Sequence, residues 1–274
     1  MTRTTLSVRN TPRRILFLYR RLFGQQLKAI LEYSSDFYVM IGAAALTQIV
    51  GFLFLWVVFS RIPVIQGWGF WEVAFMYAMI YFSEGVGSLF FEGTWRMLRL
   101  VNMGELDRYL VRPMPIVLQI FCTGIGMNGI GNIAIGGAII GMSLYHVDID
   151  WSVTSVLAAL VVLASALAVR IGINLAANCS AFWTRTSGNA FPIMVHNMGE
   201  FAKYPITIYS LGLQLFLALG VPFAFVSFVP AAVLFGKEDW AAYGWLSPLA
   251  AAYVFGIALL LLRIGLRRYE SSGN

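Results

Sequence analysis

A few polar and ionisable residues lie inside long apolar runs of the sequence, at spacings that place them on common helix faces. Arg170, Asn174 and Asn178 are four residues apart, and so are Asn128 and Asn132. An ionisable group at membrane depth is costly and marks a functional site by default. These residues could line a polar route or hold helices together by hydrogen bonds. The full set is Glu84, Asn128, Asn132, Arg170, Asn174, Asn178, His196 and Glu200.

Two of these residues, Glu84 and Arg170, fall at the same depth when positions are counted along their apolar runs. Burying either charge alone would be strongly unfavourable, whereas pairing offsets part of the cost. We therefore predict that Glu84 and Arg170 form a buried ion pair.

No pattern typical of catalysis is found. The nearest match to a phosphate-binding loop, around Gly236 and Lys237, lacks the first glycine and the final hydroxyl residue. With only two histidines and two cysteines there is no zinc-ligand spacing and no nucleophile arrangement. Cys122 and Cys179 lie in apolar runs and are expected to be buried small residues. The chain is not expected to be an enzyme, to hold a metal or cofactor, or to bind nucleic acid.

The composition requires a membrane protein. Of 274 residues, 59% are hydrophobic and 12% are charged, and the mean hydropathy is +0.76. A soluble globular domain does not have this balance. A helix of about 20 apolar residues crosses the hydrocarbon core, so the expected fold is an all-α, multi-pass membrane protein.

The chain divides into a terminal segment 1–36, a transmembrane domain 37–266 and a tail 267–274. Residues 12–33 form a basic amphipathic helix that should lie in the membrane interface. The glycines of the third span, including Gly137 and Gly141, should permit close packing. The expected spans are 37–59, 70–91, 114–145, 152–181, 188–204 and 241–266.

A charged island at 93–113 separates the second and third spans. Apolar residues recur in it at helical spacing, with charged residues between them, and Pro113 ends it. Such a helix can lie against lipid headgroups or dock into a soluble partner.

Residues 182–240 allow two topologies. Hydropathy selects 205–230 as a span and leaves 187–204 as a polar connector. However, Pro205, Pro222 and Pro230 interrupt the run, and such broken segments usually fold back within the protein. A six-span count places 15 of the 19 basic residues inside, with Arg61, Lys203 and Lys237 outside and Arg170 within a span. Both termini should therefore face the cytoplasm.

Several segments together resemble the ABC-2 type permease family, and in particular its drug-exporter-like and uncharacterised branch. They are Met103–Met114, with the sequence MGELDRYLVRPM, Phe201–Ile206, Pro222–Val226, Val229–Ala231 and Gly265–Gly273. The resemblance covers nearly the whole chain.

The resemblance implies six spans, an interfacial amino-terminal helix, and a coupling helix at 93–113 that docks on a separate ATP-binding subunit. It implies a dimer of permeases, with a heteromer favoured, and places ATP and magnesium on the partner ATPase. It also makes 188–204 the fifth span and 206–235 a re-entrant hairpin, with Ser210 and Ala232 on the outer side. The expected coupling residues are Gly104, Glu105, Leu106, Asp107, Arg108, Leu110, Arg112 and Pro113.

The function predicted from these features is that of a permease subunit of an ABC exporter in a prokaryotic cytoplasmic membrane, moving an amphiphilic or hydrophobic substrate. The alternative is a secondary transporter or channel, which would need an ion relay or an inverted repeat. A membrane enzyme is the third possibility, although no catalytic constellation supports it.

Overall fold

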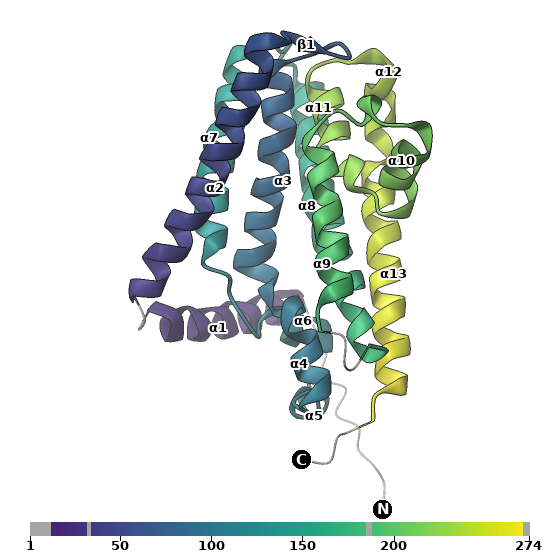
Figure 1. Cartoon of the computed structure of the whole chain (residues 1–274). Helices are drawn as coiled ribbons and strands as arrows, with labels where there is room; N and C mark the ends of the chain where they lie inside the picture. Colours follow the sequence, from purple (N-terminus) through teal and green to yellow (C-terminus); the bar gives the residue numbers. More distant parts are fainter. Residues whose placement is uncertain (1–11, 32–33, 185–187, 271–274) are drawn as a thin grey trace, which may run out of the picture.

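The computed structural model describes residues 12–31, 34–184 and 188–270, which are mostly helical. Figure 1 shows long helices standing side by side and one helix, α1 (Pro12–Leu31), lying across the end of the bundle. The long helices are α2 (Ser34–Arg61), α3 (Phe70–Phe91), α7 (Asn128–His146), α8 (Val153–Asn178) and α13 (Ser247–Arg268). The shorter ones are α4 (Met97–Asn102), α5 (Asp107–Leu110), α6 (Ile116–Phe121), α9 (Ala190–Asn197), α10 (Leu211–Leu215), α11 (Phe228–Leu234) and α12 (Glu238–Ala241).

Within the described ranges, four helical stretches are long and apolar enough to cross a membrane, namely Tyr38–Arg61, Phe70–Asn102, Val153–Phe182 and Asp239–Arg268. A fifth crossing is possible if Leu211–Gly220 and Phe223–Leu234, which are bent by 74°, count as one span. The expected multi-pass helical class is therefore confirmed, while the count of six is not. Arg185, one of the basic residues placed inside by the orientation count, lies outside the described residues.

The predicted third span, 114–145, is wrong as a single helix. It consists of α6, a break, and the 19-residue α7. In the break, the Thr123 carbonyl accepts a hydrogen bond from Arg96 Nη1 at 2.7 Å, and the Gly126 amide donates to the Ser88 carbonyl at 2.9 Å. Irregular backbone at membrane depth persists where the protein itself supplies such partners.

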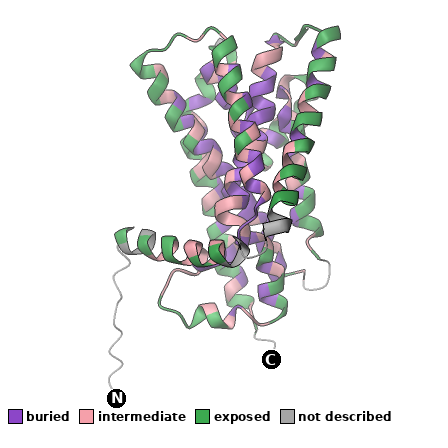
Figure 2. Cartoon of the chain, turned by 90° about the vertical axis from the view of Figure 1, so that its left-hand side faces the viewer, coloured by how far each residue is buried: buried purple, intermediate pink, exposed green. Residues whose placement is uncertain are grey.

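Helix α3 occupies the centre of the bundle. Its apolar window is 67% buried within the chain, against 11% for that of α2, and Figure 2 shows buried residues gathered along the middle of the bundle. Close approach to α7 occurs at two facing glycines. A Cβ on Gly85 would lie 2.8 Å from the Gly129 carbonyl oxygen, and one on Gly129 would lie 2.6 Å from that of Gly85.

Close packing was predicted at Gly137 and Gly141, but the structure places neither at a tight contact. A Cβ on Gly137 would meet Phe82 at an ordinary 3.8 Å, and one on Gly141 would meet nothing within 4 Å. Among the glycines of the predicted third span, close packing therefore occurs at Gly129, Gly131 and Gly136, and not at Gly137 or Gly141.

The island is not one continuous helix. A 3-10 turn (Glu92–Arg96) leads into α4, and a tight turn at Gly104, with φ of +67°, separates α4 from α5. Glycine suits this backbone conformation because it has no Cβ. Leu106 lies fully buried in an apolar cluster that includes Met97 and Leu100 of α4, Leu175 of α8 and Leu262 of α13. The island is thus fastened to the bases of α8 and α13.

The opposite end of the bundle carries a two-stranded hairpin, β1 (Val64–Ile65) and β2 (Trp68–Gly69), close to α11 and α12 (Figure 1). Lys237 Nζ joins these parts. It lies 2.9 Å from Glu72 Oε1, donates to the Gly67 carbonyl at 2.9 Å, and sits over the Trp68 ring. Helix α1 is held at the island end, where the Tyr19 hydroxyl donates to the Phe90 carbonyl at 2.6 Å.

Candidate functional site

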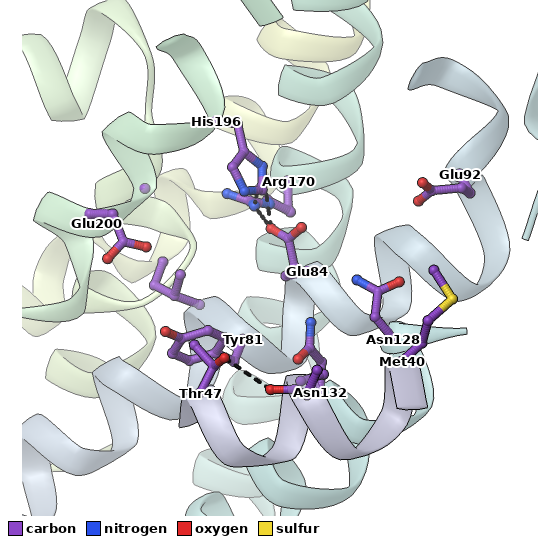
Figure 3. Close-up of a pocket in the computed structure, with 14 residues that line it drawn as sticks. Met40, Thr47, Tyr81, Glu84, Glu92, Asn128, Asn132, Arg170, His196 and Glu200 are labelled. Atoms are coloured by element: carbon purple, nitrogen blue, oxygen red, sulfur yellow. Dashed lines mark hydrogen bonds and ion pairs between the residues drawn. The ribbon is translucent and has the colours of Figure 1, made fainter. Parts of the chain in front are cut away.

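A polar cleft of about 570 Å³ lies between α2, α3, α7, α8 and α9 (Figure 3). It contains six of the eight candidate polar residues: Glu84, Asn128, Asn132, Arg170, His196 and Glu200. Met40, Ala43, Ala44 and Thr47 of α2 form one wall, and the remaining lining residues are Ile80, Tyr81, Glu92 and Gly199.

The predicted pair of Glu84 and Arg170 is present. Arg170 Nη2 contacts Glu84 Oε2, joining α8 to α3. His196 of α9 completes the cluster, with its Nδ1 3.2 Å from Arg170 Nη2 and 3.5 Å from Glu84 Oε2. A guanidinium can only donate hydrogen bonds, so Nδ1 is the acceptor in its contact with Arg170. Three helices are thereby linked at one point.

Arg170 is enclosed on every side, with 1% of its side chain exposed. Its guanidinium lies over the Phe223 ring, 5.2 Å from the centroid. Within the described part of the chain, Nε and Nη1 have no hydrogen-bond partner. A buried charged donor without a partner is costly, so this arginine has hydrogen-bonding capacity that the chain itself does not use.

The two asparagine stripes have different surroundings. Asn128 and Asn132 line the cleft, where Asn128 Oδ1 lies 3.0 Å from Ser88 Oγ and Asn132 Oδ1 accepts from Gln48 Nε2 at 3.0 Å. Asn174 and Asn178 do not line it. Asn178 Nδ2 instead donates to the carbonyl of Asn174 in its own helix, at 2.9 Å. Helical spacing therefore grouped Asn128 with Asn132 correctly, but of the stripe Arg170, Asn174 and Asn178 only Arg170 lines the cleft.

Lys203, which the six-span count placed at the outer end of the fifth span, has a side chain that is only 7% exposed. Its Nζ lies 2.6 Å from Glu200 Oε2 and 2.8 Å from the Tyr81 hydroxyl. Sequence reasoning did not identify Lys203, Tyr81 or Gln48 as part of this polar region. The spacing of three residues between Glu200 and Lys203 was a usable signal for their pairing.

The island presents an apolar tip to solvent. Met103 is 58% exposed, Leu110 48% and Val111 83%. Arg108, Arg112 and Pro113 are also exposed around it. Glu105 is bound within the island by Arg99, at 3.2 Å, and Asp107 begins α5.

Leu106 and Gly104 were expected among the residues that couple to the ATPase. The Leu106 side chain is instead fully buried within its own chain. Gly104 is required by its backbone turn, with φ of +67°. The exposed surface that a partner could contact lies instead at Met103, Leu110 and Val111.

Both cysteines are buried and free, as expected. Within the described ranges, no group of three or more histidine, cysteine, aspartate or glutamate residues is arranged to hold a metal ion.

A family model described as ABC-2 family transporter protein matches residues 45–273. No curated protein and no solved structure matches the chain. The match covers nearly the whole transmembrane domain and confirms the resemblance inferred from the sequence motifs.

Proposed function

Since the chain belongs to the ABC-2 transporter family, we propose that it is the membrane-spanning permease subunit of an ABC exporter. Members of this family are transport components that work with ABC ATPase subunits. In this proposal the partner ATPase binds ATP and magnesium and supplies the energy. The permease sits in a prokaryotic cytoplasmic membrane, with both termini on the cytoplasmic side, and pairs with a second, related permease.

The exposed tip of the island is the observation that carries the proposal. Large apolar side chains outside the hydrocarbon core are expected to be covered by a partner. Behind the tip, the buried cluster around Leu106 connects the island to α8 and α13. A push on the tip would therefore move helices that extend through the bundle, which is how ATP-driven motion could reach the cleft.

The cleft is the proposed translocation path. Helices α3, α8 and α9 meet there at Glu84, Arg170 and His196, so a change in helix positions would alter its shape. Helix α1 and the ends of α8 and α13 lie at the same end of the bundle as the island (Figure 1). This arrangement supports a common cytoplasmic side for the island and both terminal helices.

Docking can be tested with one substitution made at opposite ends of the molecule. Val111→Asp places a charge on the exposed tip, and we expect it to abolish co-purification with the ATPase and substrate-stimulated ATP hydrolysis. Val64→Asp is the matched control, because Val64 is also exposed, at 58%, but lies in the hairpin at the other end. Equal association of wild type, Val111→Asp and Val64→Asp would show that the tip is not the docking surface.

Leu106→Arg is unsuitable for the same test. An arginine at a fully buried position would disturb the cluster that supports the island. Loss of association in that variant would report on folding as much as on docking.

A further inference from the structure

We propose that the cleft selects amphiphilic organic cations that also carry a hydrogen-bond acceptor oxygen. This inference rests on the proposed function, since it names the substrate class for the same path. Three features of the cleft carry it: the sign of its accessible charge, the unused donors of Arg170, and its apolar wall.

The charge that a ligand would meet in the cleft is negative. Glu200 is 65% exposed and Glu84 is 20% exposed, whereas Arg170 is 1% exposed. Lys203, which pairs with Glu200, is buried and does not line the cleft. The positive charges therefore lie behind the carboxylates and the carboxylates face the space.

Glu92 adds a further carboxylate at one side of the cleft (Figure 3). Its Oε2 accepts a hydrogen bond from Ser88 Oγ at 2.7 Å. Among the described residues it has no ion-pair partner. A cationic group on a ligand would supply the counter-charge for Glu92, whereas a purely anionic ligand would be repelled by it, because Glu84 and Glu200 already have basic partners.

The unpartnered donor nitrogens of Arg170 are the reason to expect an acceptor oxygen on the ligand. Nη1 lies next to Gly199, which itself lines the cleft, and a Cβ on Gly199 would come within 2.9 Å of that nitrogen. Nη1 is itself buried, so an acceptor would bind it only on entering the space beside Gly199, where no side chain is present. A carbonyl or ether oxygen entering there would satisfy a donor for which the described chain provides no partner.

The wall formed by α2 explains the amphiphilic requirement. Met40, Ala43 and Ala44 contribute apolar side chains to the lining of the cleft. The volume of about 570 Å³ is within the range of sites for drug-sized molecules. One side of a ligand can therefore remain apolar while the other contacts the carboxylates.

Binding to the purified full-length permease in neutral phosphatidylcholine nanodiscs, with no ATPase present, tests this inference directly. Rhodamine 6G is a cationic xanthene with an ester carbonyl, and fluorescein is an anionic xanthene with the same ring system. By fluorescence polarisation, corrected with empty nanodiscs, we expect saturable binding of rhodamine 6G and at least about tenfold weaker binding of fluorescein, because like charges repel it from the cleft.

Substitutions then locate the contacts. Glu92→Gln and Glu200→Gln should each weaken rhodamine 6G binding about fivefold, as expected for loss of one partly exposed ion pair. Glu270→Gln, the same change on the exposed tail, should have no effect. Gly199→Ala should weaken rhodamine 6G but not tetraphenylphosphonium, a cation without an acceptor oxygen, measured by displacement.

Binding of neither dye, equal binding of both, or unchanged affinity in both Glu→Gln variants would overturn the inference. Equal losses of the two cations in Gly199→Ala would remove the role of Arg170 as the acceptor's partner. Because the assay contains no ATPase, these outcomes are separate from the docking result, and loss of ATPase association in Val111→Asp would stand in either case.

Discussion

Arg170 and Lys237 each connect separate segments of the chain, one in the middle of the bundle and one at the hairpin end. Arg170 joins α3, α8 and α9 through Glu84 and His196. Lys237 joins the hairpin, the start of α3 and the start of α12 through Glu72, the Gly67 carbonyl and Trp68. Both are basic residues that hold helices together, but their surroundings differ.

The two residues differ in their exposure to solvent and in how many of their donor nitrogens have a hydrogen-bond partner. The Lys237 side chain is 30% exposed, so water can replace any lost partner. The Arg170 side chain is 1% exposed, and two of its donor nitrogens have no partner in the described chain. Breaking the contacts of Lys237, which we call the Lys237 clamp, should therefore cost little free energy. Breaking the central cluster should cost much more, and Arg170 in it still has donor nitrogens that a ligand could bind.

The largest effect should follow from breaking the central pair. Arg170→Met leaves Glu84 without its partner, and we expect a loss of about 3 to 5 kcal/mol in the free energy of unfolding. Denaturant titration in mixed micelles would measure it. The double variant Arg170→Met with Glu84→Gln should recover part of the loss, because neither charge is then stranded. A double variant whose loss equals the sum of the two single losses would contradict the pairing.

The central pair was predictable because a lone charge at membrane depth needs a partner, and counting residues placed Glu84 at the depth of Arg170. The long helices α2, α3, α8 and α13 were also predictable from the length of their apolar runs. Both inferences depend on properties that a single segment carries in its own sequence.

The errors arose where the outcome depends on contacts between segments. Composition could not distinguish a helix from an irregular stretch at 122–127, because Arg96 and Ser88, far away in the sequence, supply its hydrogen bonds. Likewise, amphipathic spacing could not show that Leu106 turns inward against α8 and α13 while Val111 remains exposed. The contact of Lys203 with Tyr81 was not predicted, because Tyr81 lies more than a hundred residues earlier in the sequence.

A smaller effect is expected at the clamp. Lys237→Met should reduce the free energy of unfolding by no more than about 1 kcal/mol, because the pair with Glu72 is partly solvated. Measured in the same titration, this variant serves as the matched comparison for Arg170→Met. A loss as large as that of Arg170→Met would show that the hairpin end is as strongly coupled to the bundle as its centre.

The smallest effect on stability is expected for single cysteine substitutions at exposed positions. Labelling these cysteines tests which end of the bundle faces the outside of the cell. Ser210 is exposed before α10 and Asp239 is exposed within α12, on either side of the bent pair of helices. Ala232, which sequence reasoning also placed on the outer side, is fully buried and would not react. In a background lacking Cys122 and Cys179, Ser210→Cys and Asp239→Cys should both react with an impermeant maleimide added outside intact cells.

Arg108→Cys, at the opposite end in the island, should react only after the cells are permeabilised. If Ser210→Cys and Asp239→Cys label from opposite sides, the bent pair is a transmembrane span and the re-entrant hairpin is wrong. If both label only after permeabilisation while Arg108→Cys labels from outside, the whole orientation is inverted. Labelling of both from outside would instead place the solvated Lys237 clamp at the outer surface, and the apolar tip at Val111 in the cytoplasm, where an ATPase could reach it.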